Sequence, residues 1–456
     1  MNSILLVFSI FFTLIYLLQR KKEDYKLSII LISRIFIGII FIYSGIVKAV
    51  DPLGYTYKII DYFVAFGFSP MEDFAFILAI FFSTAEFILG FGLIVGLYLR
   101  KYLYLVILFM LVFTPLTLVL AITNPVSDCG CFGDALVITN WQTFWKNIVI
   151  DVPVLILFIN RSRMKDSFSS NKAVIINTLA LLSIVYVSIY SFQHLPIFDF
   201  RPYKIGLNIK EGMQMPEGEE GDLFKSTFLY KNTETQEIQE FDEEELDKPL
   251  SNEDLWEFVD TKTIKIKEGY HPPIHDFSIV NNRLGDITNE VLSDSNYTFI
   301  LVSYNLSKAN FNAFKVFEEL SKNISDARFL VLTAALDDQI KSMKDSLFQA
   351  PSFVTEKEKQ TKIVYMYEFE GNIVEFEEKD LPNDEDAYVF IGTEEIEMEL
   401  GVEENFPFDF FSCDPTTLKT IIRANPGLIL IRNGSVIDKW HYNDFPSPKE
   451  IEKIIK

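Results

Sequence analysis

The sequence has few of the residues that build metal sites and disulfide frameworks. Its 456 residues include three cysteines and four histidines. Cys129 and Cys131 are one residue apart and have no histidine nearby, so they do not complete a tetrahedral zinc site. His271 and His275 enclose two prolines, which do not continue a helix, so their spacing does not indicate ligands on one helix face. We therefore expect no metal site.

Basic residues are scarce in the second part of the chain. Residues 1–192 contain 14 Lys and Arg against 11 Asp and Glu, whereas the remainder contains 27 against 52. Nucleic-acid binding needs a basic face, and this balance opposes it. We expect the excess of acidic residues to form a solvated surface.

Long apolar runs are confined to the first 192 residues. A helix needs about 17–25 residues to span a bilayer, and six runs qualify. They lie near 2–19, 27–49, 72–98, 102–123, 143–160 and 173–192. The first run precedes its basic cluster, Arg20-Lys21-Lys22, and no small-residue cleavage site follows. We therefore expect a retained transmembrane helix there instead of a signal peptide.

The distribution of basic residues between the apolar runs predicts the orientation. Basic residues gather near 20–26, 100–101 and 161–172, whereas the connections at 50–71 and 124–142 are acidic or weakly charged. Because cytoplasmic loops are the basic ones, the Cys129–Cys131 loop and everything after residue 193 are expected outside. The same count places the N-terminus outside. The expected location is a bacterial inner membrane, with the C-terminal part in the periplasm.

Several ionisable residues lie in or beside the apolar runs, and four of them bear on function. Charges in a membrane are costly, so Arg34, Glu86 and Asp151 are expected to be functional or paired. At a rise of about 1.5 Å per residue they lie at similar depths, which makes a pair of Arg34 with Glu86 or with Asp151 feasible. Such a pair fits a structural role or a proton- or quinone-related role. Lys48, at the outer end of its run, is expected to snorkel to the interface.

Segments of two apolar runs and one loop resemble the DoxX/MauE superfamily of small four-helix membrane proteins. Arg34-Ile35-Phe36-Ile37-Gly38 and Tyr43-Ser44-Gly45-Ile46-Val47-Lys48 with Asp51-Pro52 resemble its first helix. Glu86-Phe87-Ile88-Leu89-Gly90 resembles its second helix. Cys129-Gly130-Cys131-Phe132-Gly133 points to the MauE (methylamine utilisation) branch. The resemblance covers about residues 27–160.

This resemblance implies a fold and a biological context. The fold is an α-helical membrane bundle with a four-helix core over 27–165, flanked by transmembrane helices within 1–26 and 166–192. The context is redox maturation of exported proteins, especially disulfide formation in partners. Quinone-linked electron transfer in related proteins makes quinone the candidate cofactor.

The spacing of the cysteine pair bears on its chemistry. An exported compartment permits disulfides, and a bond between Cys129 and Cys131 closes a very small ring at the limit of the usual geometry. Strained or exposed disulfides are the labile, catalytic ones. This pair is therefore the candidate redox site. A static staple and two buried thiols packed under the loop are the alternatives.

Residues 193–270 predict a small β-rich exported module. Segments 227–230 and 238–241 flank a polar turn and indicate a hairpin, and a further strand is expected at 261–267. The segment carries no recognisable chemistry. We expect it to hold the following domain above the membrane.

Residues 271–456 alternate between strands and helices. Strands are expected at 298–304 and 327–334 and helices at 309–323 and 336–348, a pattern that predicts a parallel sheet. A strand, an Asn-Gly turn and a second strand follow Pro426, and a helix over 447–455 ends the pattern. This part resembles a TlpA-like thioredoxin fold. The resemblance implies a cis bond at Asn425-Pro426 and a substrate-binding loop around these two residues.

The same domain departs from thioredoxins where their Cys-x-x-Cys motif stands. That place reads Tyr304-Asn305-Leu306-Ser307-Lys308, without cysteine, so the domain does not perform dithiol exchange alone. Cys413 is the third cysteine of the chain. We interpret it as a packing residue, with a transient mixed disulfide to Cys129 or Cys131 as the alternative.

An insertion is expected at about 352–405. Segments 362–367 and 372–376 predict a hairpin, and 377–386 is an acidic run. The run is interpreted as a solvated surface or as a docking face for a basic partner.

Two functions compete on the sequence. In the first, an inner-membrane oxidoreductase uses Cys129 and Cys131 to assist redox maturation or assembly of exported or envelope proteins, with a quinone as electron acceptor. In the second, the protein is not an enzyme but a membrane-anchored scaffold within an envelope complex, binding through the thioredoxin-like domain. A small-solute transporter rests on the intramembrane charges alone.

Overall fold

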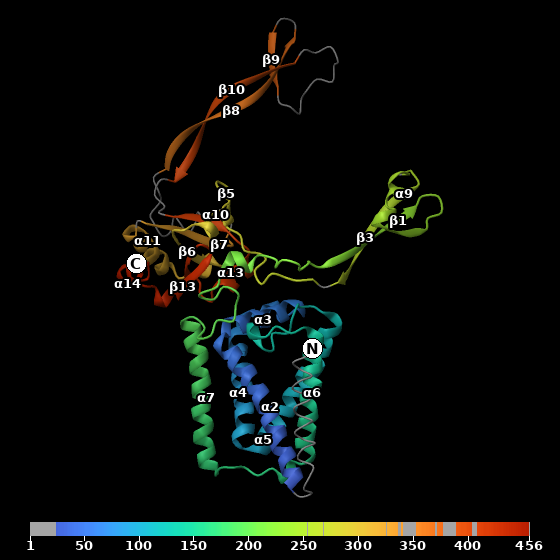
Figure 1. Cartoon of the computed structure of the whole chain (residues 1–456), viewed down its shortest axis with the longest axis vertical. Coiled ribbons are helices and arrows are strands. Elements are labelled where there is room, and N and C mark those ends of the chain that lie inside the picture. The colour runs from blue at the N-terminus through green and yellow to red at the C-terminus, as the bar shows by residue number, and fades with distance from the viewer. Residues whose placement is uncertain are drawn as a thin grey trace.

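We describe the fold from a computed structural model of the chain. It describes residues 24–252, 254–267, 269–324, 326–335, 339–340, 353–369, 372–376, 389–403 and 408–455. The expected helix over 2–19 and the acidic run 377–386 lie outside these ranges, as does most of the expected helix over 336–348. A helical bundle carries an α/β domain at one end, and a β-sheet arm extends from that domain (Figure 1).

Five helices of the described part are long and apolar enough to cross a membrane, which confirms five of the predicted spans and a multi-pass membrane protein. They are α2 (Asp24–Val50), α4 (Ala75–Val95), α5 (Leu99–Thr123), α6 (Asn140–Ile159) and α7 (Ser170–Gln193). The loop between α5 and α6, which holds both cysteines, lies at the same end of the bundle as the α/β domain (Figure 1).

Glycines allow α2 and α4 to approach closely. A Cβ atom at Gly45 would lie 2.6 Å from the Phe87 amide nitrogen, and one at Gly90 would lie 2.6 Å from the Gly38 carbonyl oxygen. Close backbone contact through small residues is how membrane helices gain packing energy, since lipid removes most of the hydrophobic driving force. This contact fixes the positions of the polar side chains that α2 and α4 direct toward each other.

The connection between α2 and α4 contains an additional helix, α3 (Pro52–Ala65), followed by the short 3-10 helix η1 (Ser69–Phe74). Asp51 caps α3 by accepting a hydrogen bond from the Gly54 amide at 2.9 Å, and Pro52 occupies the first helical position. Figure 1 shows α3 across the end of the bundle, between the membrane helices and the α/β domain.

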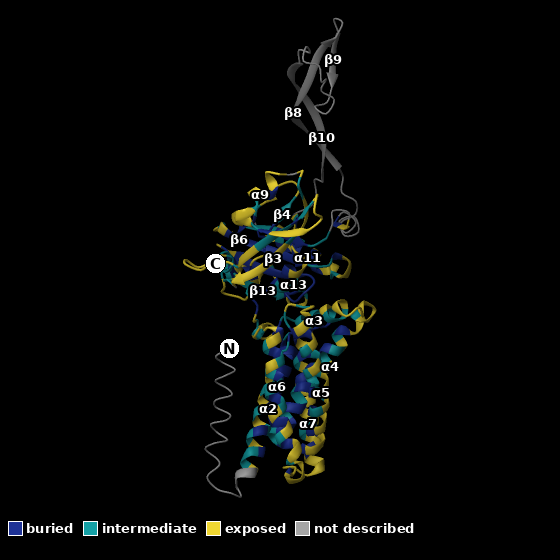
Figure 2. Ribbon diagram, turned by 90° about the vertical axis from the view of Figure 1, so that its right-hand side faces the viewer, coloured by how far each residue is buried: buried dark blue, intermediate teal, exposed yellow. Residues whose placement is uncertain are grey.

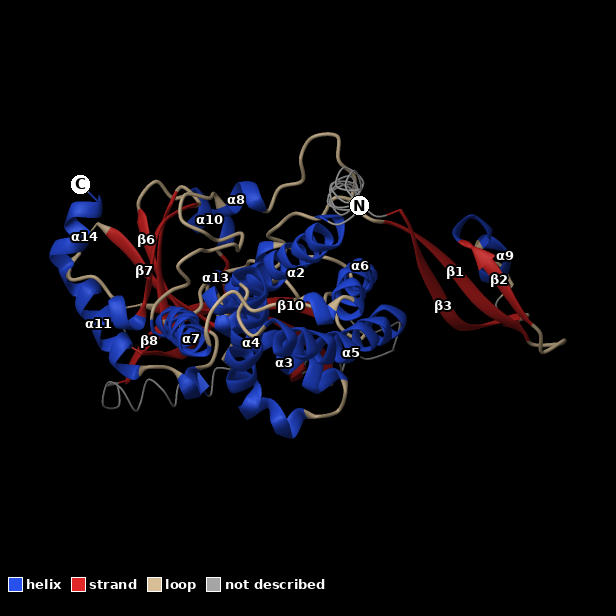
Figure 3. Cartoon of the chain, turned by 90° about the horizontal axis from the view of Figure 1, so that it is seen from below, coloured by secondary structure: helices blue, strands red, loops and turns tan. Residues whose placement is uncertain are grey.

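The arm is a three-stranded antiparallel sheet in the order β2-β1-β3. Its strands are β1 (Leu223–Asn232), β2 (Ile238–Asp242) and β3 (Trp256–Lys267). Phe228 pairs with Phe241, which confirms the predicted hairpin, and the expected strand at 261–267 is part of β3. Figure 3 shows the arm reaching away from the rest of the chain.

The α/β domain is built on a seven-stranded sheet of order β13-β12-β6-β7-β11-β4-β5. The predicted parallel pairing is present between β6 and β7 and between β7 and β11, and β12 runs antiparallel to β6 and β13. The strands are β4 (Val280–Asn281), β5 (Gly285–Asp286), β6 (Tyr297–Ser303), β7 (Ala327–Thr333), β11 (Asp409–Ser412), β12 (Gly427–Arg432) and β13 (Ser435–His441).

Alternate side chains of the central strands supply two cores. Phe299 and Leu301 pack toward α11 (Phe311–Asn323) and α14 (Pro448–Ile455). Ile300 and Val302 pack on the opposite face. The helices on that face are α8 (Ile209–Gly212), α10 (Thr288–Ser293) and α13 (Pro415–Ile421). The two buried layers appear dark blue in Figure 2.

Two further findings concern the predicted boundaries and the insertion. Tyr203 and Ile209, placed by sequence in the module 193–270, pack in the α/β core. In the insertion, β8 (Phe353–Phe369) pairs with β9 (Asn372–Phe376), which confirms the predicted hairpin, and also with β10 (Val389–Glu403). The short helix α9 (Asp247–Leu250) belongs to the arm.

Candidate functional site: the cysteine loop and its cavity

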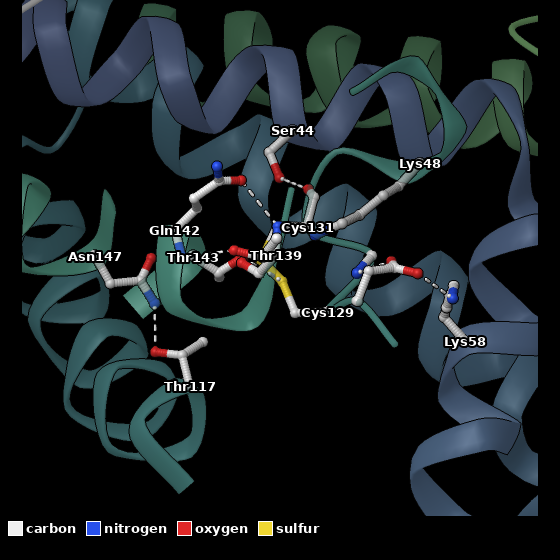
Figure 4. Close-up of a disulfide and its surroundings, with 12 residues drawn as sticks. Ser44, Lys48, Lys58, Thr117, Cys129, Cys131, Thr139, Gln142, Thr143 and Asn147 are labelled. Carbon is white, nitrogen blue, oxygen red and sulfur yellow. Dashed lines mark hydrogen bonds and ion pairs between the residues drawn. A yellow bond between two sulfur atoms is a disulfide. The ribbon is translucent and has the colours of Figure 1, made fainter. Parts of the chain in front are cut away.

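Cys129 and Cys131 lie in the loop between α5 and α6. Their sulfur atoms are paired as a disulfide, their Cα atoms are 5.5 Å apart, and Cys129 is only 5% exposed (Figure 4). Cys131 is the more exposed of the two. Gly130 and Gly133 have φ angles of +62° and +50°, which glycine adopts without the penalty that a Cβ atom brings.

Side chains of α2 and α3 hold one side of this loop. The Tyr62 hydroxyl donates a hydrogen bond to the Cys129 carbonyl at 2.6 Å. Lys58 forms an ion pair with Asp128 at 2.6 Å, and Asp128 also accepts from the Gly130 amide. Because these contacts restrain the backbone on both sides of Cys129, the cysteine pair is positioned by the membrane domain itself.

Helix α6 holds the other side. The Thr143 hydroxyl oxygen lies 3.3 Å from the Cys129 sulfur and donates its proton to the Thr139 carbonyl at 3.0 Å. Thr139 and Gln142 form a capping box that starts α6 at this point. The lone pairs of Thr143 can therefore accept a hydrogen bond from a Cys129 thiol when the pair is reduced.

A buried ion pair lies beneath the cysteine loop. Lys48 Nζ is 2.7 Å from Glu86 Oε1, and both side chains are almost completely buried. The Ser44 hydroxyl lies 2.7 Å from Glu86 Oε2 and 2.7 Å from the Cys131 carbonyl oxygen. Its single proton can be donated to only one of them at a time, so Ser44 links the ion pair to the loop.

The predicted position of Lys48 is wrong. It does not snorkel to the interface, because α3 folds over the end of α2 and places the Tyr55 ring 4.7 Å from Lys48 Nζ. The charge then needs a buried partner, and Glu86 on the adjacent helix α4 supplies it.

The pairs of Arg34 with Glu86 and with Asp151, feasible by depth, are not formed. Arg34 Nε donates to the Leu93 carbonyl at 2.9 Å, and Nη2 donates to the Ile94 carbonyl at 3.3 Å. Both carbonyls belong to the last turn of α4, where no helical amide remains to pair with them. Asp151 accepts a hydrogen bond from Thr114 at 3.0 Å.

The cysteine pair lines a cavity of about 70 Å³ between the helix ends nearest the α/β domain. Its polar lining includes Ser44, Lys48, Tyr55, Tyr62, Glu86, Lys146 and Asn147. The apolar lining includes Phe109, Met110 and Phe113. Lys146 Nζ lies 4.6 Å from the centre of the Phe132 ring, and no described carboxylate pairs with it. Glu86 is already paired with Lys48, so Lys146 contributes to the cavity an amine that no described carboxylate neutralises.

Arg423 joins the α/β domain to the cysteine loop. Its Nε atom is 3.0 Å from Asp51 at the start of α3, and Nη2 is 2.8 Å from Asp134, three residues after Cys131. The Arg423 side chain is 6% exposed. Burial alone would lower the Arg423 pKa, but Asp51 and Asp134 more than offset it, so the pKa lies above its usual value.

The predicted proline loop lies at the same interface. The Asn425-Pro426 bond is cis, as predicted. Asn425 donates to the Asn305 carbonyl at 2.7 Å and accepts from Ser303 at 2.9 Å, so this loop contacts the segment that follows β6. The ring of Tyr304 packs edge-on against Tyr57 of α3, with ring centres 6.2 Å apart. This edge of the α/β domain therefore faces the membrane domain.

Cys413 does not join the other two cysteines. It is a free thiol in the core of the α/β domain, and its sulfur lies 4.0 Å from the Asp276 carbonyl oxygen. Burial raises the pKa of the Cys413 thiol, so the reactive thiolate is disfavoured there. The geometry favours the packing interpretation over a mixed disulfide. No group of His, Cys, Asp and Glu suited to a metal ion occurs among the described residues.

Sequence reasoning missed several residues that build the site. Tyr62, Lys58 and Lys146 contribute to it, but they come from segments treated as a connection or as an apolar run. Asp134 and Arg423 are separated by 289 residues, so no local pattern joins them. The available signal was the position of Asp128 and Asp134, two charged residues that flank the cysteines directly.

Comparison with known proteins identifies one family. A family model described as methylamine utilisation protein MauE matches residues 26–160. This segment runs from α2 to α6 and includes the cysteine loop, but neither α7 nor the α/β domain. No curated protein and no solved structure matches the chain. The membrane domain from α2 to α6 is thus similar to MauE, a family with a redox and maturation context.

Proposed function

We propose that this protein exchanges disulfides with exported proteins through Cys129 and Cys131 and so assists their redox maturation. One observation carries the proposal: the paired cysteines line a cavity together with the Lys146 side chain, which no described carboxylate pairs with, at the end of the bundle that faces the α/β domain. Cationic surroundings lower the pKa of thiols and favour thiolate chemistry. The location that suits this chemistry is a bacterial inner membrane with the α/β domain in the periplasm.

The exchange proceeds in two steps. A partner thiolate attacks the more exposed sulfur, Cys131, and the bond between Cys131 and Cys129 breaks. Cys129 leaves as a thiolate into the cavity that Lys146 also lines. It takes up a proton and, as a thiol, donates a hydrogen bond to Thr143. A second partner thiolate attacks the mixed disulfide. The partner leaves with a new disulfide, and Cys129 and Cys131 remain as two thiols, so two electrons and two protons have moved to this protein.

Regenerating the pair requires an acceptor for two electrons and two protons. A quinone supplies that chemistry when bound. The residues of the cavity fit such a group: Phe109 and Phe113 offer aromatic faces, and Lys146 offers a donor for a carbonyl oxygen without being held by a carboxylate. With a quinone as the electron acceptor, the proposed activity is that of a quinone-linked thiol oxidoreductase.

The α/β domain acts as a binding module in this proposal. Its resemblance to a thioredoxin fold supports this role, whereas Asn425 and Pro426 themselves are buried at the interface with the membrane domain. It brings no dithiol of its own. Through Arg423 it is held against the loop that carries the cysteines, so a partner bound there is brought to the reacting sulfurs.

A scaffold without catalysis is the second candidate. The observation that favours it is the burial of both Cys129 and Arg423, because a closed interface and a buried disulfide also serve a static junction between two domains. In that function the cysteine pair is a staple for the loop, and the partners are other envelope proteins.

Trapping of a mixed disulfide tests the proposal. In a Cys129→Ser variant, the Cys131 thiolate attacks a disulfide of an exported protein and releases one partner thiol, and no second cysteine resolves the mixed disulfide. We expect disulfide-linked adducts with exported proteins on non-reducing gels, which disappear on reduction. Cys413→Ser is the matched control and should give the wild-type pattern. Absence of adducts in Cys129→Ser and in Cys131→Ser cells, with normal maturation of exported proteins, would support the scaffold instead.

A further inference from the structure

A second cavity opens on the lipid-facing side of the bundle, between α5 and α6. Its volume is about 440 Å³. It is lined by Ile107, Met110, Leu111, Thr114, Asp151 and Leu155, among others. Leu111 and Leu155 are largely exposed on the surface that contacts lipid. We call this cavity the α5–α6 groove.

Asp151 is an ionisable residue in the otherwise mostly apolar lining of the groove. Its carboxyl accepts a hydrogen bond from Thr114 at 3.0 Å, and no described cation pairs with it. Asp151 stands 11 residues into α6, about 16 Å along its axis, and therefore lies near the middle of the bilayer. Pro115, one residue after Thr114, has no N–H to donate to the Leu111 carbonyl. The groove thus offers hydrogen-bond acceptors at a depth where they are costly and tend to be functional.

The α5–α6 groove adjoins the cavity of the cysteine pair. Met110 lines both, and the neighbours Ile150 and Asp151 line the inner cavity and the groove respectively. Met110 is 5% exposed, and it is the lining residue that the cysteine cavity and the groove share. A methionine side chain is unbranched and adapts its shape readily, so it can separate two cavities and still let a flat group pass.

The chemistry of the groove selects its occupant. The headgroup of a phospholipid belongs at the bilayer surface, and a lipid tail makes no use of Asp151. An anionic head is repelled by the carboxylate. A neutral ring with carbonyl or hydroxyl groups and an apolar tail suits both the mid-bilayer acceptors and the apolar walls.

We propose that the α5–α6 groove admits an isoprenoid quinone from the bilayer, and that Met110 is the gate to the cavity of Cys129 and Cys131. This inference rests on the proposed function, in which a quinone accepts two electrons and two protons from the two thiols. A bound quinone would take the two electrons and two protons released when the Cys129–Cys131 bond re-forms. Asp151 would serve as a hydrogen-bond acceptor for a hydroxyl group in the groove.

The test uses the full chain in proteoliposomes and two readouts. The first is photolabelling with an azido-quinone, mapped by mass spectrometry, with unlabelled quinone as competitor. The second is the rate at which the reduced cysteine pair is reoxidised, by quinone or by the water-soluble oxidant diamide. The variants are Met110→Trp, which fills the gate, and Asp151→Asn, which removes the carboxylate. Leu108→Trp is the matched control, because Leu108 is exposed on the same helix and lines neither cavity.

We expect the azido-quinone to label α5 and α6, and we expect unlabelled quinone to suppress this labelling. The Met110→Trp and Asp151→Asn variants should both be labelled less than wild type. Reoxidation by quinone should fall about tenfold or more in Met110→Trp and stay at the wild-type rate in the Leu108→Trp control. In Met110→Trp the ratio of the quinone rate to the diamide rate should fall as well. Labelling that is spread over all lipid-facing helices and is not competed would mean that only lipid occupies the groove, and would overturn the inference. If diamide-treated protein oxidises no dithiol substrate, the proposed function itself fails.

Discussion

Two loops lie at the interface between the membrane domain and the α/β domain, one from each domain, and only one of them carries cysteines. The loop between α5 and α6 carries Cys129 and Cys131 and is fixed by Tyr62 and Lys58. The segment after β6, beginning at Tyr304, carries no thiol and is fixed by hydrogen bonds to Asn425. The difference assigns any thiol chemistry to the membrane domain and leaves contact and positioning to the α/β domain.

The two sides of this interface also differ in where their ion pairs are formed. Beneath the cysteine loop, Lys48 and Glu86 form a closed pair within the membrane domain. Above it, Arg423 reaches from the α/β domain to Asp51 and Asp134. Removing one member of a buried ion pair leaves an uncompensated charge. Substitutions at Lys48 and at Arg423 therefore test the membrane domain and the interface between the domains separately.

The largest effect is expected from Lys48→Met. The change leaves Glu86 buried without its partner, and we expect a loss of about 3–5 kcal/mol in the stability of the membrane domain. Thermal unfolding in detergent measures it. A Lys48→Met/Glu86→Leu double variant removes both charges and should recover most of the loss. If the single variant were as stable as wild type, the pair would not organise the site.

Arg423→Ala should separate the domains without unfolding either one. It leaves the carboxylates of Asp51 and Asp134 without their partner, and we expect the interface to weaken by about 3 kcal/mol. Asp134 is 37% exposed, so the loss comes mainly from Asp51. Hydrogen exchange should rise in α3 and in the cysteine loop.

Arg432→Ala is the control for this experiment, because Arg432 is exposed and contacts only its own domain. Faster reaction of the cysteine pair with an added reductant is expected in Arg423→Ala alone. Equal protection of the cysteine loop in both variants would show that Arg423 does not hold the domains together.

His441 should make the α/β domain sensitive to acid. Burial is the main cause that lowers the His441 pKa from 6.5 to about 4. The nearby His194 lowers it further, and Asp444 raises it by less than burial lowers it. Its Nδ1 accepts a hydrogen bond from the Asn443 amide, which requires the neutral ring. Between pH 6.5 and 4 the unfolded chain therefore binds a proton that the folded domain does not, and stability falls as the pH drops.

The expected loss is roughly 2–3 kcal/mol, complete below about pH 4. Chemical unfolding of the full chain at pH 7, 5.5 and 4 measures it. His441→Asn keeps an acceptor at the position of Nδ1 but does not titrate in this range, so its stability should depend less on pH. The same pH dependence in both proteins would assign the effect to other groups.

Tyr62→Phe should have the smallest effect. It removes the hydrogen bond to the Cys129 carbonyl and keeps the ring, so we expect a loss of about 1 kcal/mol. Hydrogen exchange of residues 128–134 should rise, whereas exchange in the β6 strand should not change. An equal rise in both would contradict a local role for Tyr62.

The sequence predicted elements better than it predicted partners. The five spans follow from apolar length, and the hairpin of β1 and β2 follows from alternation and a polar turn. Depth along a helix gave the heights of Arg34, Glu86 and Asp151, but it does not say which faces meet. The close approach of α2 and α4 decides that, and it brings Lys48 to Glu86.

Local sequence patterns did not predict which residues meet at the interface between the two domains. Arg423 and Asp51 lie 372 residues apart, and their contact depends on how two separately folded cores meet. The cis Asn425-Pro426 bond was predicted from a family resemblance, not from the residues alone. Helix α3 was missed because a short helix at a membrane surface has neither the length nor the continuous apolar character of a span.

Differential alkylation of the three cysteines in whole cells tests the central claim most directly. Thiols are blocked with one maleimide, disulfides are then reduced, and the new thiols are labelled with a second maleimide for mass spectrometry. We predict that Cys129 and Cys131 change together between the disulfide and thiol forms when exported dithiol proteins accumulate or when quinone is depleted. Cys413, buried in the α/β core, should remain a thiol throughout. A cysteine pair whose redox state never changes under these conditions would contradict thiol exchange in the membrane domain.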